Sequence, residues 1–208
     1  MPPFSLYNLN KSKSPDYSQE YEPAAISVVA NDSTSFIVMG NINGQLNISK
    51  VTANEISIIL SVDMKQKIMA VNSVLDPESR LTVTILMENT IIRHSMVSDS
   101  GISTCLTRGF CFLSEIFSAD LSTNAFNFVE YFDDIFVQCW DGSIRIINCL
   151  DTSNVKSISI PNFTLPGRMK MVGSTVVISQ GNCILGFRIE KLLSLTGDQE
   201  YVTVSQAI

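Results

Sequence analysis

One pattern recurs four times along this 208-residue chain: a run of β-branched and aliphatic residues, a tight polar turn, and a second such run. Its clearest copy spans residues 136–148, where Asp141-Gly142 separates the two runs. Asp-Gly between β-rich runs is a strong hairpin signal, and a type I′ turn with positive φ at both central residues is expected there. The other copies have their turns at Asn43-Gly44, Glu88-Asn89 and Gly181-Asn182.

The hairpins are spaced almost regularly. The first apolar residues after the turns follow one another at intervals of 45, 53 and 40 residues, and they are Leu46, Ile91, Ile144 and Ile184. Paired strands that repeat about every 40–45 residues are typical of β-propeller blades. The sequence therefore predicts an all-β propeller with about four blades, at approximately 24–62, 66–114, 124–160 and 168–204.

The two ends of the chain differ from this pattern. Residues 1–20 are rich in Pro, Ser and Lys without apolar periodicity, which predicts a mobile N-terminal tail ahead of a propeller at 21–208. Residues 189–195 could form one or two helical turns, and 201–204 read as a further strand. Because the chain stops just after that strand, it is either a four-bladed structure or part of a larger ring.

Composition narrows the class of function. The net charge is −6, a poor match for phosphate backbones, so no direct nucleic-acid binding is expected. We find no secretory signal and no apolar run long enough to span a membrane. Five cysteines without a Cys-x-x-Cys pair, and a single histidine, His94, argue against a metal site or cofactor. The cysteines are expected to be small apolar fillers of a reduced intracellular protein.

The third and fourth repeats permit a narrower comparison. Cys139-Trp140-Asp141-Gly142-Ser143-Ile144 is followed by Leu165-Pro166-Gly167-Arg168 and then by the aliphatic run Val176-Val177-Ile178. This combination resembles the WD-repeat β-propellers, and within them a subfamily that holds the mitotic checkpoint propeller and the nuclear-pore mRNA export propeller. The Trp-Asp pair that usually ends the third strand of a WD repeat is replaced in all four copies. The resemblance implies a seven-bladed ring, of which this chain holds about four blades.

The resemblance also implies a function and a location. The chain would be a non-enzymatic scaffold that binds a GLEBS-type peptide of a Bub-type kinase, in the nucleus (kinetochore or nuclear pore) and cytoplasm. An mRNA export propeller that binds a nucleoporin peptide is the first alternative. A divergent scaffold of unrelated function and a small propeller enzyme are the others, but no catalytic motif supports the last one.

Three residues are candidates for peptide binding. Trp140 stands at a turn between strands, where it could anchor a peptide or instead pack on a neighbouring blade. Asp141 fits a carboxylate that stabilises the turn. Arg168 matches an Arg of the subfamily and could pair with acidic residues of a bound peptide, or it could be a plain surface residue.

The remaining charged residues are expected to be solvated. Arg93 and Arg145 lie on third strands and are interpreted as edge charges. Glu130, Asp133 and Asp134 form an acidic group near a strand entry, which we interpret as a solvated connection rather than a catalytic pair.

Overall fold

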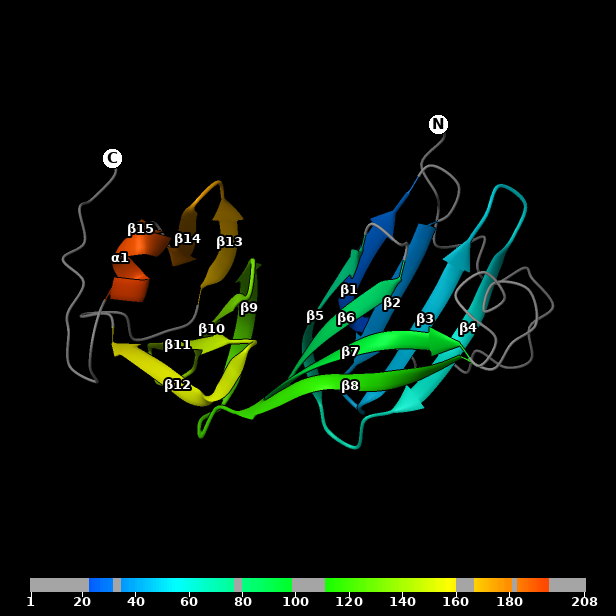
Figure 1. Ribbon diagram of the computed structural model, residues 1–208, viewed down its shortest axis with the longest axis horizontal. Coiled ribbons are helices and arrows are strands. Elements are labelled where there is room, and N and C mark those ends of the chain that lie inside the picture. The colour runs from blue at the N-terminus through cyan, green and yellow to red at the C-terminus, as the bar shows by residue number, and fades with distance from the viewer. Residues whose placement is uncertain are drawn as a thin grey trace.

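The computed structural model describes residues 23–31, 35–76, 80–98, 111–159, 167–180 and 183–194. The predicted tail at 1–20 and the strand expected at 201–204 lie outside the described residues. Each described sheet is an antiparallel meander, in which strands that follow one another along the chain are hydrogen-bonded neighbours (Figure 1).

Four such sheets follow one another along the chain. The first holds β1 (Pro23–Ala30), β2 (Ser35–Asn41), β3 (Gln45–Val51) and β4 (Ile56–Asp63). The second holds β5 (Ile68–Leu75), β6 (Leu81–Met87), β7 (Thr90–Ser98) and β8 (Cys111–Asp120). The third holds β9 (Ala125–Tyr131), β10 (Asp134–Cys139), β11 (Ser143–Asn148) and β12 (Asp151–Ser159). The fourth holds β13 (Arg168–Val172), β14 (Thr175–Gln180) and β15 (Cys183–Arg188), and the short helix α1 (Ile189–Ser194) follows it.

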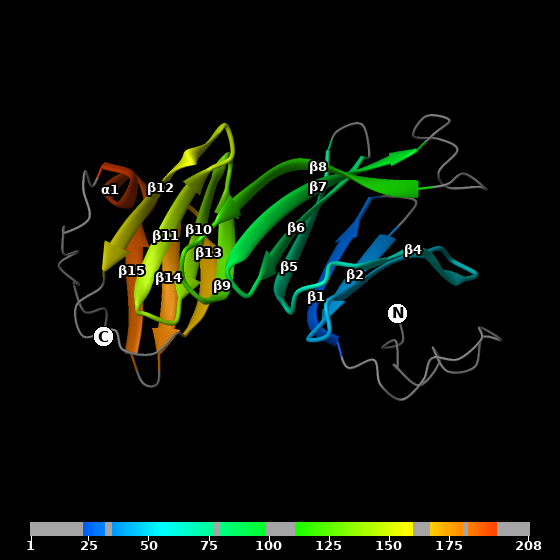
Figure 2. The ribbon, with the colours of Figure 1, turned by 90° about the horizontal axis from the view of Figure 1, so that it is seen from below.

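The sheets stack face to face as the blades of a four-blade propeller arrangement. A separate apolar core fills each of the three junctions between consecutive sheets. Val38 and Ile48 of the first sheet meet Val83 and Ile85 of the second, and all four side chains are fully buried. In the views of Figures 1 and 2 the first and fourth sheets lie at opposite ends of the row. The all-β propeller predicted from the repeats is therefore confirmed.

Side chains of a strand within a middle sheet point alternately to its two faces, so one strand contributes to two cores. Phe136 on β10 belongs to the core between the third and fourth sheets, whereas Ile135 and Val137 belong to the core between the second and third. Successive side chains of a strand point to opposite faces of its sheet. A strand buried on both faces must therefore be apolar throughout, as residues 135–137 are.

The repeat seen in the sequence corresponds to one structural position. Each residue that marks the period is the second residue of the third strand of its sheet, and these are Leu46 in β3, Ile91 in β7, Ile144 in β11 and Ile184 in β15. The longest interval crosses the second sheet, whose last strand β8 continues to Asp120, past the blade end at 114 expected from the sequence.

The predicted type I′ turn at Asp141-Gly142 is wrong. Gly142 has a φ of 81°, and Asp141 is not among the residues with positive φ. The N–H of Gly142 donates to the carbonyl of Cys139 at 3.2 Å, which closes a four-residue turn over the loop at 140–142. This is the three-residue hairpin loop, in which only the last residue is left-handed. Gly44, with a φ of 87°, ends an equivalent loop that begins at Ile42.

Candidate interaction surface

The turns between the second and third strands of the first three sheets lie on the same side of the row of sheets. We call this side the turn face and define it by its exposed residues Ile42, Glu88, Asn89, Trp140 and Asp141. Backbone hydrogen bonds tie these turns to the segments that link one sheet to the next. Met64 N–H donates to Gly44 at 2.8 Å, Leu121 to Asn89 at 2.9 Å, and Trp140 to Asn124 at 2.9 Å. The turns and the linkers therefore form one continuous surface.

Trp140 is half exposed on this surface, at 48% of its accessible area. Its ring meets the ring of Phe126 from β9 edge to face, with the centroids 5.2 Å apart and an interplanar angle of 83°. Edge-to-face contact is a favoured arrangement of aromatic pairs. The contact holds one part of the indole in place within its own blade and leaves the rest open to a partner.

Asp141 stabilises the turn that presents Trp140. Its Oδ1 accepts hydrogen bonds from the backbone N–H of Ser143 at 2.9 Å and from the Ser143 hydroxyl at 2.5 Å. Its Oδ2 lies 3.4 Å from a guanidinium nitrogen of Arg145. Burial acts to raise the pKa of Asp141, but the bonds from Ser143 and the charge of Arg145 outweigh it, so the pKa lies below its usual value. Arg145 is thus an ion-pair partner rather than the solvated edge charge that we expected.

Arg168 is exposed and begins β13, on the same side of the row of sheets as the turn of Trp140. The preceding carbonyl, that of Gly167, accepts a hydrogen bond from Asn127 Nδ2 at 3.4 Å. Asn127 in turn is paired with Gln138, near the end of β10. The fold therefore places Arg168 on the side of the turn face, although no contact between the side chains of Arg168 and Trp140 is found among the described residues.

Two charged residues that we expected to be solvated lie together and are mostly shielded from solvent. Arg93 on β7 and Glu130 on β9 form an ion pair at 2.8 Å, and their side chains are only 15% and 12% exposed. Glu130 is also a strand residue rather than part of a connection. The pair lies where the second sheet packs on the third, a location that the spacing along the chain could not reveal.

The thiols of Cys139 and Cys149 are poor nucleophiles. Cys139 is fully buried and Cys149 half buried, and both are free. Burial raises the pKa of each thiol to about 11. Among the described residues, no group of His, Cys, Asp and Glu is arranged to hold a metal ion, and no helix has the length and hydropathy of a membrane span.

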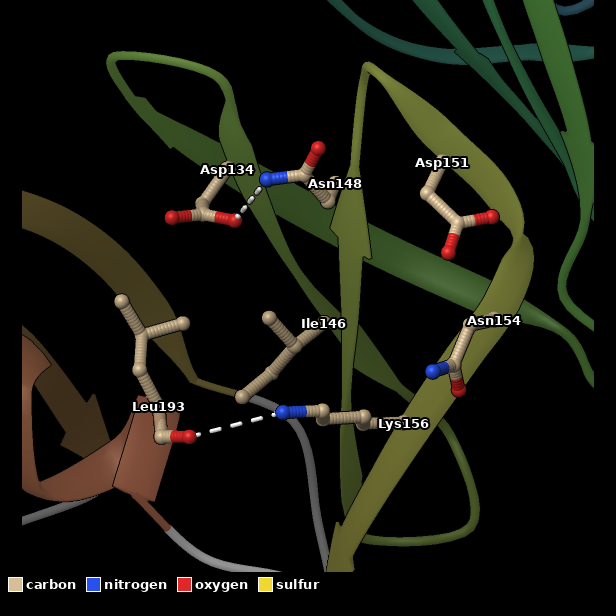
Figure 3. Close-up of a pocket in the computed structure, with 7 residues that line it drawn as sticks. All are labelled: Asp134, Ile146, Asn148, Asp151, Asn154, Lys156 and Leu193. Carbon is tan, nitrogen blue, oxygen red and sulfur yellow. Dashed lines mark hydrogen bonds between the residues drawn. The ribbon is translucent and has the colours of Figure 1, made fainter.

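A second exposed surface lies at the other end of β10, and none of the sequence motifs pointed to it. Phe132, in the turn between β9 and β10, is 83% exposed, and Leu150, in the turn between β11 and β12, is 82% exposed. A cavity of about 240 Å³ lies beside these turns, and its lining includes Asp134, Asn148 and Asp151 (Figure 3). The signal that could have found this surface is a large apolar residue next to an acidic one in a turn, which occurs at both positions.

Known proteins resemble this chain in sequence profile and in fold. The model of the family described as PTHB1 N-terminal matches residues 4–206. No curated protein matches the sequence. A crystal structure of the computationally designed Ika4 protein has a TM-score of 0.57 at 12% identity and covers 83% of this chain and 94% of that chain.

A crystal structure of BBS1N in complex with ARL6DN, soaked with lead, is a second similar fold. Its TM-score is 0.58 at 15% identity, and the match covers 84% of this chain and 54% of that chain. This chain thus spans about half the length of the BBS1N chain. At these identities the two structures establish a common fold alone.

Proposed function

Since the chain belongs to the PTHB1 N-terminal family, we propose that it is a non-enzymatic propeller module that binds a protein partner through its turn face. BBS1N, which shares the fold, is found in complex with ARL6DN. The single observation that carries the proposal is the exposure of two large apolar side chains at equivalent turns, Ile42 at 56% and Trp140 at 48%.

The chemistry of the turn face suits protein docking. Trp is the residue type most enriched at energetically dominant interface positions, because it buries a large rigid area at little cost in side-chain entropy. Phe126 already orients Trp140, and Asp141 stabilises its turn. Trp140 therefore loses little conformational entropy when a partner binds. Glu88, Asn89 and Asp141 supply the polar rim that surrounds such anchors.

Site-specific photo-crosslinking in cells tests the proposal even while the partner is unidentified. A benzophenone amino acid is placed at position 140 of the full chain and, as a matched control, at Ile116, which is 53% exposed on β8. Position 140 is expected to give discrete protein adducts that position 116 does not give. Equal adducts at both positions would contradict a docking surface at the turns.

Purified components then test the energetics. For a partner so identified, and for ARL6DN as a candidate, Trp140→Ala is expected to weaken binding by about 2 kcal/mol or more. Thermal unfolding of the variant should remain cooperative, because the lost contact is a half-exposed ring pair. Unchanged affinity in a folded variant would remove Trp140 from the interface.

A narrower alternative is that the partner is a GLEBS-type peptide of a checkpoint kinase or a nucleoporin, held by Trp140, Asp141 and Arg168. The position of Arg168 on the side of the turn face favours this alternative, and nothing in the comparisons supports it. A nuclear location belongs to this alternative. Titration with the two peptides, in the wild type and in Arg168→Ala, separates it from docking of a folded protein.

A further inference from the structure

Phe132 and Leu150 are the most exposed large apolar side chains among the described residues. They stand in adjacent turns, because the N–H of Cys149 donates to the carbonyl of Asp133 at 2.7 Å. Apolar side chains exposed to this degree in adjacent turns mark interaction sites more often than isolated ones do.

The backbone presents Phe132 in a conformation that its side chain disfavours. Phe132 has a φ of 52°, and a positive φ is a true outlier for a bulky residue. It is the first residue of a two-residue hairpin loop, a position at which glycine is favoured. The ring of Tyr131 lies against Phe132, with the centroids 4.6 Å apart. A phenylalanine at this position therefore satisfies no backbone preference and projects its ring into solvent.

The two turns are fixed relative to each other. Asn148 Nδ2 donates to Asp134 Oδ1 at 2.9 Å, and Asn148 Oδ1 accepts the N–H of Leu150 at 2.9 Å. One asparagine side chain thus connects the turn of Phe132 with the turn of Leu150. The apolar pair is displayed by a rigid support, which reduces the entropy lost when a partner binds.

The surroundings of the pair are acidic. Asp133 follows Phe132 directly, and Asp134 and Asp151 line the adjoining cavity, whose lining also includes Ile146 and Leu193 (Figure 3). One basic side chain, that of Lys156, also lines the cavity, and its ammonium group donates to the carbonyl of Leu193 at 3.4 Å. A lysine or arginine side chain suits such a space, because its stem packs on apolar walls while its head meets carboxylates.

We propose that Phe132, Asp133, Asp134, Leu150 and Asp151 form a second docking surface, which binds an extended basic-apolar segment of a protein partner. Apolar side chains of the segment cover Phe132 and Leu150, and a neighbouring lysine or arginine enters the cavity beside Asp134 and Asp151. This surface lies at the opposite end of β10 from Trp140, so the inference goes beyond the proposed function of the turn face and does not depend on it.

Fluorescence anisotropy with synthetic peptides tests the inference on the full chain. The probe is a labelled peptide of alternating arginine and leucine, and the matched peptides replace arginine by glutamate or leucine by serine. The first peptide is expected to bind at least about tenfold more tightly than either control, with an affinity that falls as salt is added. Equal affinity for all three, or no binding, would overturn the proposal.

Matched variants locate the binding. Leu150→Ser and the double variant D133N/D151N are expected to weaken binding about tenfold or more. Ile116→Ser and Asp63→Asn remove an exposed apolar and an exposed acidic side chain elsewhere, and they should leave the affinity unchanged. Trp140→Ala should also have no effect, so failure here and failure of the turn face are distinguishable. Equal loss in the control variants would show that the peptide binds by general charge and overturn the proposal.

Phe132→Gly separates binding from folding. Because glycine suits the backbone there, we expect an unfolding midpoint no lower than that of Ile116→Ser together with about tenfold weaker peptide binding. Unchanged binding would exclude Phe132 from the surface. Sedimentation of the free chain completes the test, since a wild-type dimer that Phe132→Gly dissociates would assign this surface to a second copy and overturn the proposal.

Discussion

The guanidinium of Arg93 and the carboxylate of Glu130 lie 2.8 Å apart across the junction between the second and third sheets. Each group has further partners. Glu130 accepts a hydrogen bond from Asn72 Nδ2 at 2.6 Å, and Arg93 donates to the Thr84 hydroxyl at 3.1 Å. The guanidinium also lies over the ring of Phe117, 5.4 Å from its centroid. Side chains of the second sheet thus hold both members of the pair in place.

Removal of one partner of this pair should destabilise the chain strongly. Glu130→Ala leaves the Arg93 charge buried without its counter-ion, which costs about 3–5 kcal/mol in comparable buried pairs. The pair keeps some contact with solvent, so we expect the lower end of that range in urea unfolding.

A double replacement provides the control. Arg93→Met with Glu130→Met removes both charges, so its loss of stability should be smaller than the sum of the two single variants. Asp63→Ala breaks the exposed pair with Lys65 and should change the midpoint little. Simple additivity at 93 and 130 would show that the pair is not coupled.

The close approach at Gly44 should be visible in a comparison of two glycines. An added Cβ at Gly44 would lie 2.6 Å from the backbone oxygen of Gln66, whereas at Gly173 nothing lies within 4 Å. Both have a positive φ, of 87° and 58°. Gly173→Ala should cost about 1–2 kcal/mol from the backbone alone. Gly44→Ala should cost clearly more in the same unfolding measurement, and equal costs would contradict the steric argument.

Asp141 should make the stability of the chain sensitive to acid. The pKa of its carboxyl is lower in the folded chain than the ordinary value of 3.8, so the unfolded state binds the proton more readily. The stabilisation is present above pH 3.8 and is lost as the pH falls through the folded pKa. The stability difference between the wild type and Asp141→Asn should therefore be constant near neutral pH and shrink below pH 3.8. If the stability difference between the wild type and Asp141→Asn persists in acid, it arises from the shape of the side chain and not from its charge.

His94 should act in the same direction at higher pH. Burial lowers the pKa of its imidazole from 6.5, although the charge of Glu115 opposes the shift. The unfolded state takes up the proton first, so the contribution of His94 is present above pH 6.5 and declines as the pH falls below it. Because His94 is the one histidine of the chain, His94→Leu should flatten the decline of stability between about pH 7 and pH 5. An unchanged slope would assign the decline to other groups.

Much of the fold was predictable because it depends on neighbours along the chain. Side-chain alternation and turn residues are local signals, and they identified hairpins, repeats and the position of Trp140 at a turn. The turn type was not predictable from Asp141-Gly142, because a two-residue and a three-residue loop can both contain this dipeptide. They differ in the φ of Asp141 and in whether Trp140 belongs to the loop.

The sequence by itself determined the hairpins, their repetition and the class of fold, because side-chain alternation and turn residues are local signals. It did not determine the end of β8, which continues to Asp120. Only the tertiary structure decided that Arg93 meets Glu130, 37 residues away, and that Phe132 and Leu150 are exposed in adjacent turns. Those relationships depend on how one sheet stacks on the next and on how neighbouring turns meet. Burial and charge pairing between sheets arise from that stacking, which no stretch of sequence contains.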